Sequence, residues 1–293
     1  RNLFSSDISR SSAPYAPFFP LLTLLLYNYR PQQPQPPLSR AIHSSPTLNM
    51  SPIRPAALIV GAGPGIGSAF VRRFVRSGWL VGGARRTAFD EDLSALDGFI
   101  PYEGVDARKT SDVDALFSDF TSVCSSEGAS HDLTVFNVGA NIRYSIGDTT
   151  ERKFEKCWEM GCKAGFLVGQ AAARSYLGKS APSGTMIFTG ASASLRGSAN
   201  FSAFAVAKGG LRQLAQSMAR ELSPSNVHVA HVVVDGAVDT PWVRENFGGR
   251  IAEAPEGALV EPDEVAKAYE YLHGQGRTAW TFEMDMRPYC ERW

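Results

Sequence analysis

One stretch constrains the fold of this chain more than any other: residues 56–78, AALIVGAGPGIGSAFVRRFVRSG. Residues 56–60 form a short apolar run of the kind found in strands that are buried on both faces. Four closely spaced glycines follow, and the apolar residues after them recur at helical spacing until Gly78. The stretch therefore predicts a strand, a tight glycine turn and a helix, in that order.

A turn of this kind suits a nucleotide ligand. Glycines let the backbone turn tightly and let a phosphate approach the helix N-terminus, where unpaired N–H groups and the helix dipole attract negative charge. A glycine pattern alone is a weak signal, because an ordinary strand-to-helix turn has a similar composition, but here the flanking strand and helix supply the required context. We predict that a nucleotide pyrophosphate binds at Gly61, Gly63, Gly65, Ile66 and Gly67.

The rest of the chain alternates strand-like and helical patterns. Helices are expected after a cap at Ser111 and another at Asp148, and in the apolar pattern of residues 211–222. Strands separated by helices of this length imply a parallel sheet with right-handed crossovers and helices on both faces. Further strands are predicted at 80–84, 99–105, 133–138, 185–189 and 227–234, with a last one in the tail, 279–293.

Several motifs, in the right order from residue 51 onward, resemble the short-chain dehydrogenase/reductase family. The resemblance implies one α/β domain over 51–293, built on a Rossmann-type doubly wound parallel sheet of about seven strands, with a substrate lid at about 241–262. The loop at 235–240, DGAVDT, resembles the segment that holds the nicotinamide carboxamide and is called the nicotinamide loop below. The family's usual proline is Asp235 here. Carried over by position, the cofactor contacts are Asp106, Asn137, Gly139, Gly236, Val238, Thr240 and Lys208.

The end of the second strand indicates which nicotinamide cofactor is bound. In this fold a carboxylate there binds the adenosine ribose of NAD, whereas a basic residue accepts the 2′-phosphate of NADP. The chain has Arg85 and Arg86, and no acid follows until Asp90. Arginine pairs bidentately with phosphate, so NADP(H) is favoured over NAD(H), with two merely solvated arginines as the alternative.

The predicted catalytic positions depart from the family. Relatives that reduce carbonyls use a tyrosine four residues before a lysine, a serine thirteen residues before that tyrosine, and a helical asparagine that supports a water relay. Lys208 is present here, but the three other positions are Phe204, Ala191 and Gly161. A phenyl ring has no exchangeable proton and a methyl group has no hydroxyl, so the usual proton transfer cannot run at these positions.

Tyr144 and Ser145, in the loop after the fourth strand, carry the best remaining hydroxyls. Tyr144 is the first candidate for a substitute acid, and an ordinary loop aromatic is the alternative.

Three classes of function stay open. The favoured one is an NADP(H)-dependent oxidoreductase whose small-molecule substrate needs no tyrosine acid, such as an iminium, whose positive charge Asp235 would stabilise. The second is a non-redox enzyme, a cyclase or isomerase, in which NADP is structural. The third is a nucleotide-binding pseudoenzyme. Lys208 and the nicotinamide loop, which position a reactive ring, favour the first.

The composition argues against nucleic-acid and metal partners and favours a second copy of this chain. The 293 residues carry a formal net charge of zero, so the chain has no electrostatic reason to bind nucleic acid. The four cysteines lack metal-ligand spacing, and His228 and His231 face opposite sides of one strand, so no metal site is expected. A homodimer or homotetramer is predicted from the apolar residues of the two long helices, namely Phe154, Trp158, Phe166, Leu214 and Met218.

The first 50 residues differ from the rest. They hold eight of the 18 prolines, four arginines, no lysine and a single acid, Asp7. Their apolar run, residues 18–27, is broken by Pro20 and is too short to span a membrane. Two interpretations stay open: a disordered mitochondrial presequence, or an untranslated extension before a start at Met50 that leaves the protein cytoplasmic.

Overall fold

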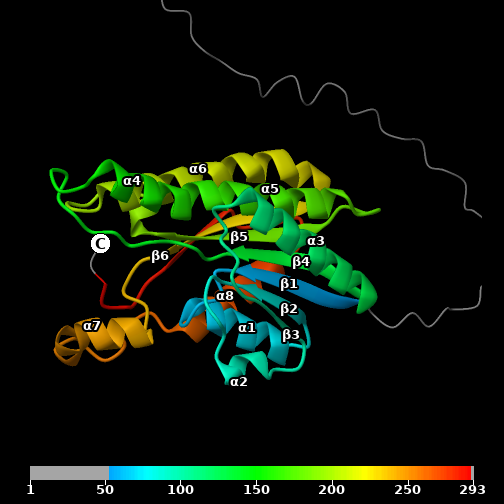
Figure 1. Cartoon of the computed structure of the whole chain (residues 1–293), viewed down its shortest axis with the longest axis horizontal. Helices are drawn as coiled ribbons and strands as arrows, with labels where there is room; N and C mark the ends of the chain where they lie inside the picture. Colours follow the sequence, from blue (N-terminus) through cyan, green and yellow to red (C-terminus); the bar gives the residue numbers. More distant parts are fainter. Residues whose placement is uncertain (1–52, 292–293) are drawn as a thin grey trace, which may run out of the picture. The chain divides into compact units, whose positions relative to one another are not determined.

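The computed structural model describes residues 53–291, and the predicted leader lies outside them. Seven parallel strands form one sheet in the order β3-β2-β1-β4-β5-β6-β7 (Figure 1). This order confirms the predicted doubly wound α/β fold, and the tail supplies the last strand as expected. The strands are β1 Arg54–Val60, β2 Leu80–Ala84, β3 Phe99–Tyr102, β4 Ala129–Phe136, β5 Gly184–Ala191, β6 Val227–Val234 and β7 Glu283–Met286.

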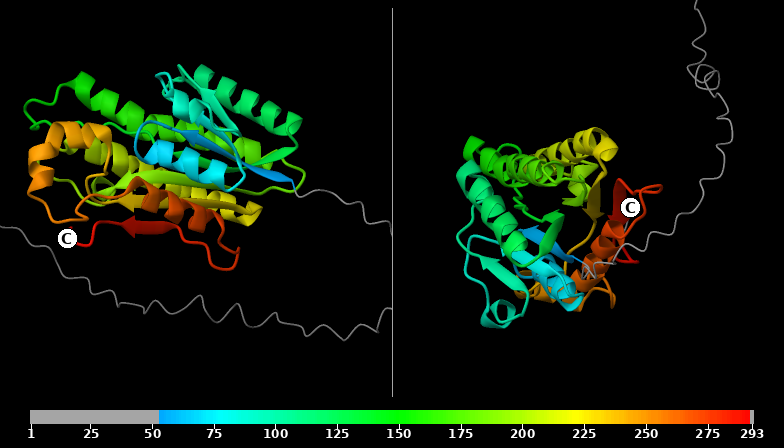
Figure 2. Two further views of the ribbon diagram at one scale, coloured as in Figure 1. Left: turned by 90° about the horizontal axis from the view of Figure 1, so that it is seen from below. Right: turned by 90° about the vertical axis from the view of Figure 1, so that its right-hand side faces the viewer.

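Helices cover both faces of the sheet, as the end-on view in Figure 2 shows. A π-helical segment, Glu159–Lys163, joins α4 to α5 without a break. No helix within residues 53–291 is long and apolar enough to cross a membrane. The α-helices are α1 Ile66–Arg76, α2 Glu91–Ser94, α3 Thr110–Ser126, α4 Glu151–Trp158, α5 Ala164–Leu177, α6 Ser202–Leu222, α7 Pro241–Ala252 and α8 Pro262–His273.

Two apolar cores lie on opposite faces of the sheet. Side chains of β1 alternate between them: Leu58 joins the core under α3, α5 and α6, whereas Ile59 joins the core under α1 and α8. Both side chains are fully buried, as the unbroken apolar run predicted. The carboxyl ends of β1, β2 and β4 therefore meet at one edge of a rigid sheet, where the predicted site residues follow them.

Both predicted helix caps are wrong by one or two residues. Thr150 caps α4, because its side chain accepts a hydrogen bond from the N–H of Lys153, whereas the carboxylate of Asp148 accepts one from Ser145. Helix α3 begins at Thr110, one residue before Ser111. Several polar residues near each helix start were able to act as the cap, and the path of the preceding loop selects among them.

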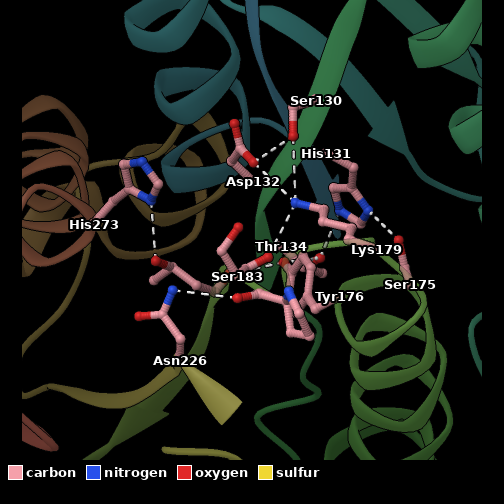
Figure 3. Close-up of polar contacts among 12 residues, drawn as sticks. Ser130, His131, Asp132, Thr134, Ser175, Tyr176, Lys179, Ser183, Asn226 and His273 are labelled. Carbon is pink, nitrogen blue, oxygen red and sulfur yellow. Dashed lines mark hydrogen bonds and ion pairs between the residues drawn. The ribbon is translucent and has the colours of Figure 1, made fainter. Parts of the chain in front are cut away.

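A polar network stabilises the opposite edge of the sheet, where β4 and β5 begin (Figure 3). The ring nitrogens of His131 lie 2.9 Å from the hydroxyls of Ser175 and Thr134. The Tyr176 hydroxyl donates to the Thr185 carbonyl at 2.8 Å. Burial lowers the pKa of His131 to about 3, so this histidine is neutral in the folded protein at neutral pH.

The two histidines of β6 also lie in the interior and on opposite faces. His228 stacks on Trp280 with the ring centroids 5.0 Å apart. His231 places Nδ1 3.0 Å from the Glu283 carboxylate, yet burial lowers its pKa to about 4. Within residues 53–291 no group of three or more His, Cys, Asp or Glu side chains has the geometry to hold a metal ion.

Candidate functional site

The glycine turn between β1 and α1 is shaped by close backbone contacts. Gly61 has a positive φ of 97°, and a Cβ there would lie 2.6 Å from the Asn137 carbonyl oxygen. A Cβ on Gly67 would lie 2.4 Å from the Gly61 carbonyl oxygen. Only glycine fits at these two positions. Gly63 differs, because a Cβ there would meet no protein atom within 4 Å.

The open side of Gly63 faces a cavity of about 260 Å³ at the carboxyl edge of the sheet. The cavity is therefore the space that the glycine turn leaves for a ligand. It brings together seven predicted cofactor residues, namely Gly61, Gly63, Arg85, Arg86, Asp106, Asn137 and Gly139, and adds Arg108 and Met160, which the sequence did not indicate.

The other predicted cofactor residues lie around this cavity without lining it. Gly65 precedes the first residue of α1, Ile66. A Cβ on Gly65 would lie 2.5 Å from the Thr240 side chain, so the glycine turn touches the nicotinamide loop. Thr240 caps α7, which begins the predicted lid, by accepting a hydrogen bond from the N–H of Val243.

The two neighbouring arginines have different surroundings. The Arg85 guanidinium donates to the carbonyls of Thr87 and Ala88 and lies 4.2 Å from the centroid of the Phe89 ring. The Arg86 side chain is exposed and lines the cavity as well as a second one of about 290 Å³ beside it. Arg85 thus stabilises the loop after β2, and Arg86 faces the ligand space.

Asp106 is paired with a residue that sequence reasoning missed. The Arg108 guanidinium makes a two-point contact with its carboxylate, with Nε to Oδ1 at 2.9 Å and Nη2 to Oδ2 at 2.6 Å. The hydrogen bond from Arg108 lowers the pKa of Asp106 to about 2. Arg108 lies outside the motifs that the family resemblance highlights, and its only signal was a position two residues after Asp106.

Lys208 is buried beneath the loop that follows β4. Its Nζ donates to the carbonyls of Thr189 at 2.7 Å and Val138 at 3.3 Å, and the residue is 5% exposed. A Cβ on Gly139 would lie 3.2 Å from Nζ, so glycine there leaves room for the lysine. Burial lowers the pKa of Lys208 to about 8.

Apolar groups surround Lys208 on α6. Phe204 lies one helical turn earlier and packs against a buried cluster of Cys157, Ala203 and Ala207, as Ile142 also does. Ala191 ends β5, and its N–H donates to the Ser194 hydroxyl at 3.2 Å. No side-chain hydroxyl or amide exists at these two positions.

Gly161 lies in the π-helical segment and packs against α6. A Cβ there would lie 2.9 Å from the Ala207 Cβ, closer than Cβ atoms approach in folded proteins. The π-helical segment and α6 therefore touch through this glycine.

Tyr144 and Asp235 each make contacts within the protein. Lys153 Nζ lies 3.4 Å from the centroid of the Tyr144 ring, and the Tyr144 N–H donates to the Asn200 carbonyl. Asp235 is 7% exposed, and Arg287 Nη1 lies 3.3 Å from its Oδ2. The Asp235 carboxylate is thus already paired with a protein cation, and its stabilisation of a substrate cation stays a prediction.

Comparison with known proteins identifies the family of this chain. The model of the short chain dehydrogenase family matches residues 55–250. The chain is 32% identical over 221 residues to the 3-oxoacyl-[acyl-carrier-protein] reductase MabA of Mycobacterium tuberculosis, a match that covers 74% of this chain and 84% of that protein. It is 27% identical to a 3alpha-hydroxysteroid dehydrogenase of Mediterraneibacter gnavus, over 74% of this chain and 88% of that protein.

Solved structures resemble it as well. A short-chain dehydrogenase from Rhodopseudomonas palustris is 39% identical, with a TM-score of 0.65 over 80% of this chain and 99% of that one. The actinorhodin polyketide ketoreductase with NADPH shares the fold, at 21% identity and a TM-score of 0.69 over 80% of this chain and 96% of that one. The sheet order, the glycine turn and the family match lead to one conclusion: the chain belongs to the short-chain dehydrogenase family.

Proposed function

We propose that this protein binds NADP(H) and transfers hydride to or from a small substrate that needs no tyrosine acid, such as an iminium. The proposal rests on a contrast between the predicted cofactor residues, which are present, and the proton-donating residues, which are absent. The groups that would hold a nicotinamide nucleotide surround a cavity, whereas the positions that would protonate an alkoxide are Phe204 and Ala191. When bound, the nucleotide supplies the hydride.

The residues fit the parts of such a nucleotide. Gly63 leaves open space at the N-terminus of α1, where a pyrophosphate would accept backbone hydrogen bonds. Arg86 would pair with the 2′-phosphate, and the Asp106–Arg108 pair would border the adenine. Lys208 would donate to the nicotinamide ribose, next to the nicotinamide loop.

A cationic substrate suits the aromatic groups at the vacated position. The Phe201 and Phe204 ring centroids lie 6.5 Å apart. The face of an aromatic ring attracts a cation, so these rings would favour an iminium over a neutral ketone. Hydride addition to an iminium gives a neutral amine and creates no alkoxide to protonate.

The second candidate is a non-redox enzyme. The apolar cluster of Phe204, Ile142 and Cys157 favours it, because such a wall shapes a substrate without reacting with it. Following NADPH oxidation across ketones, imines and enones separates the two, with deuterium transfer from labelled NADPH as confirmation. If the protein binds NADPH but oxidises it with none of these substrates, the non-redox function, or a nucleotide-binding pseudoenzyme, takes the lead.

Arg86 should determine the preference for NADP(H). Arg86→Ala is expected to weaken NADP(H) about tenfold or more and to leave NAD(H) unchanged, because it removes a charge-assisted contact to the 2′-phosphate alone. Arg85→Ala is the matched control and should change NADP(H) affinity less, since its guanidinium is used by the loop after β2. Calorimetry measures both. Equal losses in the two variants, or equal wild-type affinities for the two nucleotides, would contradict the assignment.

We also propose that the protein forms a homodimer or homotetramer through α4, α5 and α6. Phe154, Trp158 and Phe166 are 38–46% exposed, as an interface requires, whereas Leu214 and Met218 pack partly buried against the core and contribute less than the sequence suggested. Sedimentation of residues 50–293 should give a dimer or larger at micromolar concentration, and Trp158→Glu should shift it toward monomer. A monomeric wild type contradicts the proposal.

A further inference from the structure

The end of β7 and the residues that follow it contact the start of the nicotinamide loop, at Asp235 and Gly236. The N–H of Asp235 donates to the Met286 carbonyl at 2.8 Å, and the Asp235 side chain pairs with Arg287. Arg287 also pairs with Asp285. The paired side chains of Asp235 and Arg287 are only 10% and 15% exposed, so solvent weakens their attraction less than on an open surface. In Figure 1 the red C-terminal segment runs beside the loop that leads from β6 to α7.

Two segments pack against the nicotinamide loop at Gly236, one through Pro288 and one through Val260. Gly236 has a φ of 147°, and a Cβ there would lie 2.8 Å from Pro288 on one side and 3.1 Å from Val260 on the other. Val260 also bonds the loop backbone twice, by donating to the Ala237 carbonyl and by accepting from the N–H of Asp239. Glycine imposes little preference on its own φ, so the contacts from Pro288 and Val260 help to set the backbone conformation at Gly236.

Asp235 stands at a position where relatives in this family usually have a proline, which would make the loop more rigid. A proline there would fix φ but would lose the hydrogen bond to Met286, because it has no N–H. Asp235 keeps that bond and adds a charged tie to Arg287. We propose that the Asp235–Arg287 pair holds the nicotinamide loop in its binding conformation, which makes Arg287 a positioning residue for the nicotinamide end of the cofactor.

This inference rests on the proposed function, and a truncated ligand separates the two. The nucleotide 2′-phospho-ADP-ribose carries everything that the glycine turn and Arg86 would bind, but it lacks the nicotinamide. A loop released by Arg287→Met must be ordered again when the nicotinamide binds, which costs affinity for the complete cofactor alone. Arg287→Met and Asp235→Asn should therefore each weaken NADPH about tenfold and leave 2′-phospho-ADP-ribose unchanged, as measured by calorimetry.

Three further variants sharpen the test. The double variant Asp235→Asn/Arg287→Met should lose no more than either single variant, because both remove the same tie. Arg287→Lys should recover part of the affinity. Asp285→Asn is the matched control: it removes a partner of Arg287 that is not in the loop, and should leave NADPH binding nearly unchanged.

Each contrary outcome has a distinct meaning. If wild type binds neither nucleotide, the proposed function fails and this inference fails with it. If wild type binds both equally tightly, or if Arg287→Met keeps full NADPH affinity, the inference alone is overturned. A loss that NADPH and 2′-phospho-ADP-ribose share would mark a general structural role for Arg287, and it would also overturn the proposal.

Discussion

The double variant Phe204→Tyr/Ala191→Ser should reduce a small diketone with NADPH at least about a hundredfold faster than wild type. A general acid contributes roughly 10² to 10⁴ in rate, and one donor to a developing oxyanion contributes roughly 10² to 10³. Phe204→Tyr places a phenol one helical turn before Lys208, whose positive charge would lower its pKa. Ala191→Ser adds a hydroxyl at an extended residue, φ −156°, which serine adopts without strain.

The neighbouring ring provides the control. Phe201→Tyr adds the same hydroxyl seven residues before Lys208 instead of four, on a ring whose centroid lies 6.5 Å from that of Phe204, and it should give a smaller gain with the diketone. If wild type already reduces ketones rapidly, another group is the acid, and Tyr144→Phe should then abolish the activity. If the double variant binds NADPH without oxidising it, hydride transfer is not the function of this site.

The protein should lose stability as the pH falls from about 6.5 to 5, which lies above the pH range in which carboxylates titrate. Burial lowers the pKa of His131 to about 3 and that of His231 to about 4, and it also lowers the pKa of His228 and His273. The unfolded chain binds protons at these histidines below about pH 6.5 and the folded chain does not, so stability is full above that pH and falls as pH drops. His131 and His231 should each lower the free energy of unfolding at pH 5 by about 2 kcal/mol, relative to its value above pH 6.5.

Urea unfolding between pH 7.5 and 5 measures this loss. Replacing His131 by asparagine lowers stability at pH 7.5, but it should also flatten the pH dependence by about one proton, which distinguishes titration from lost packing. A urea midpoint that stays constant from pH 6.5 to 5 would contradict the assignment of these histidines as neutral.

The strands, the glycine turn and the position of Lys208 were predictable because each depends on residues close in sequence. The apolar run at 56–60 indicates a buried strand, and Gly67 is required because a Cβ there would lie 2.4 Å from the Gly61 carbonyl oxygen within the turn. The lost hydroxyls at Phe204 and Ala191 could likewise be found by counting from Lys208.

Side-chain pairings between distant segments could not be predicted. Arg85 and Arg86 are identical residues side by side, and the path of residues 87–89 decides which guanidinium is held by the loop after β2. Asp235 was interpreted as a free carboxylate because nothing near it in sequence identifies its partner, Arg287, which is 52 positions away. Such pairings depend on how the sheet brings β6 beside β7.

The contact between Gly161 and Ala207 bears on how such a site can change over evolutionary time. An asparagine at 161 would need the π-helical segment and α6 to move apart, because the Ala207 methyl group occupies the space that its Cβ requires. A substitution at 161 alone would therefore damage packing before it restored any chemistry, and a glycine at 207 would have to come first. A tyrosine at 204 or a serine at 191 needs one substitution each. An asparagine at 161 needs a second substitution at 207 as well, so the close helix packing makes its loss harder to reverse.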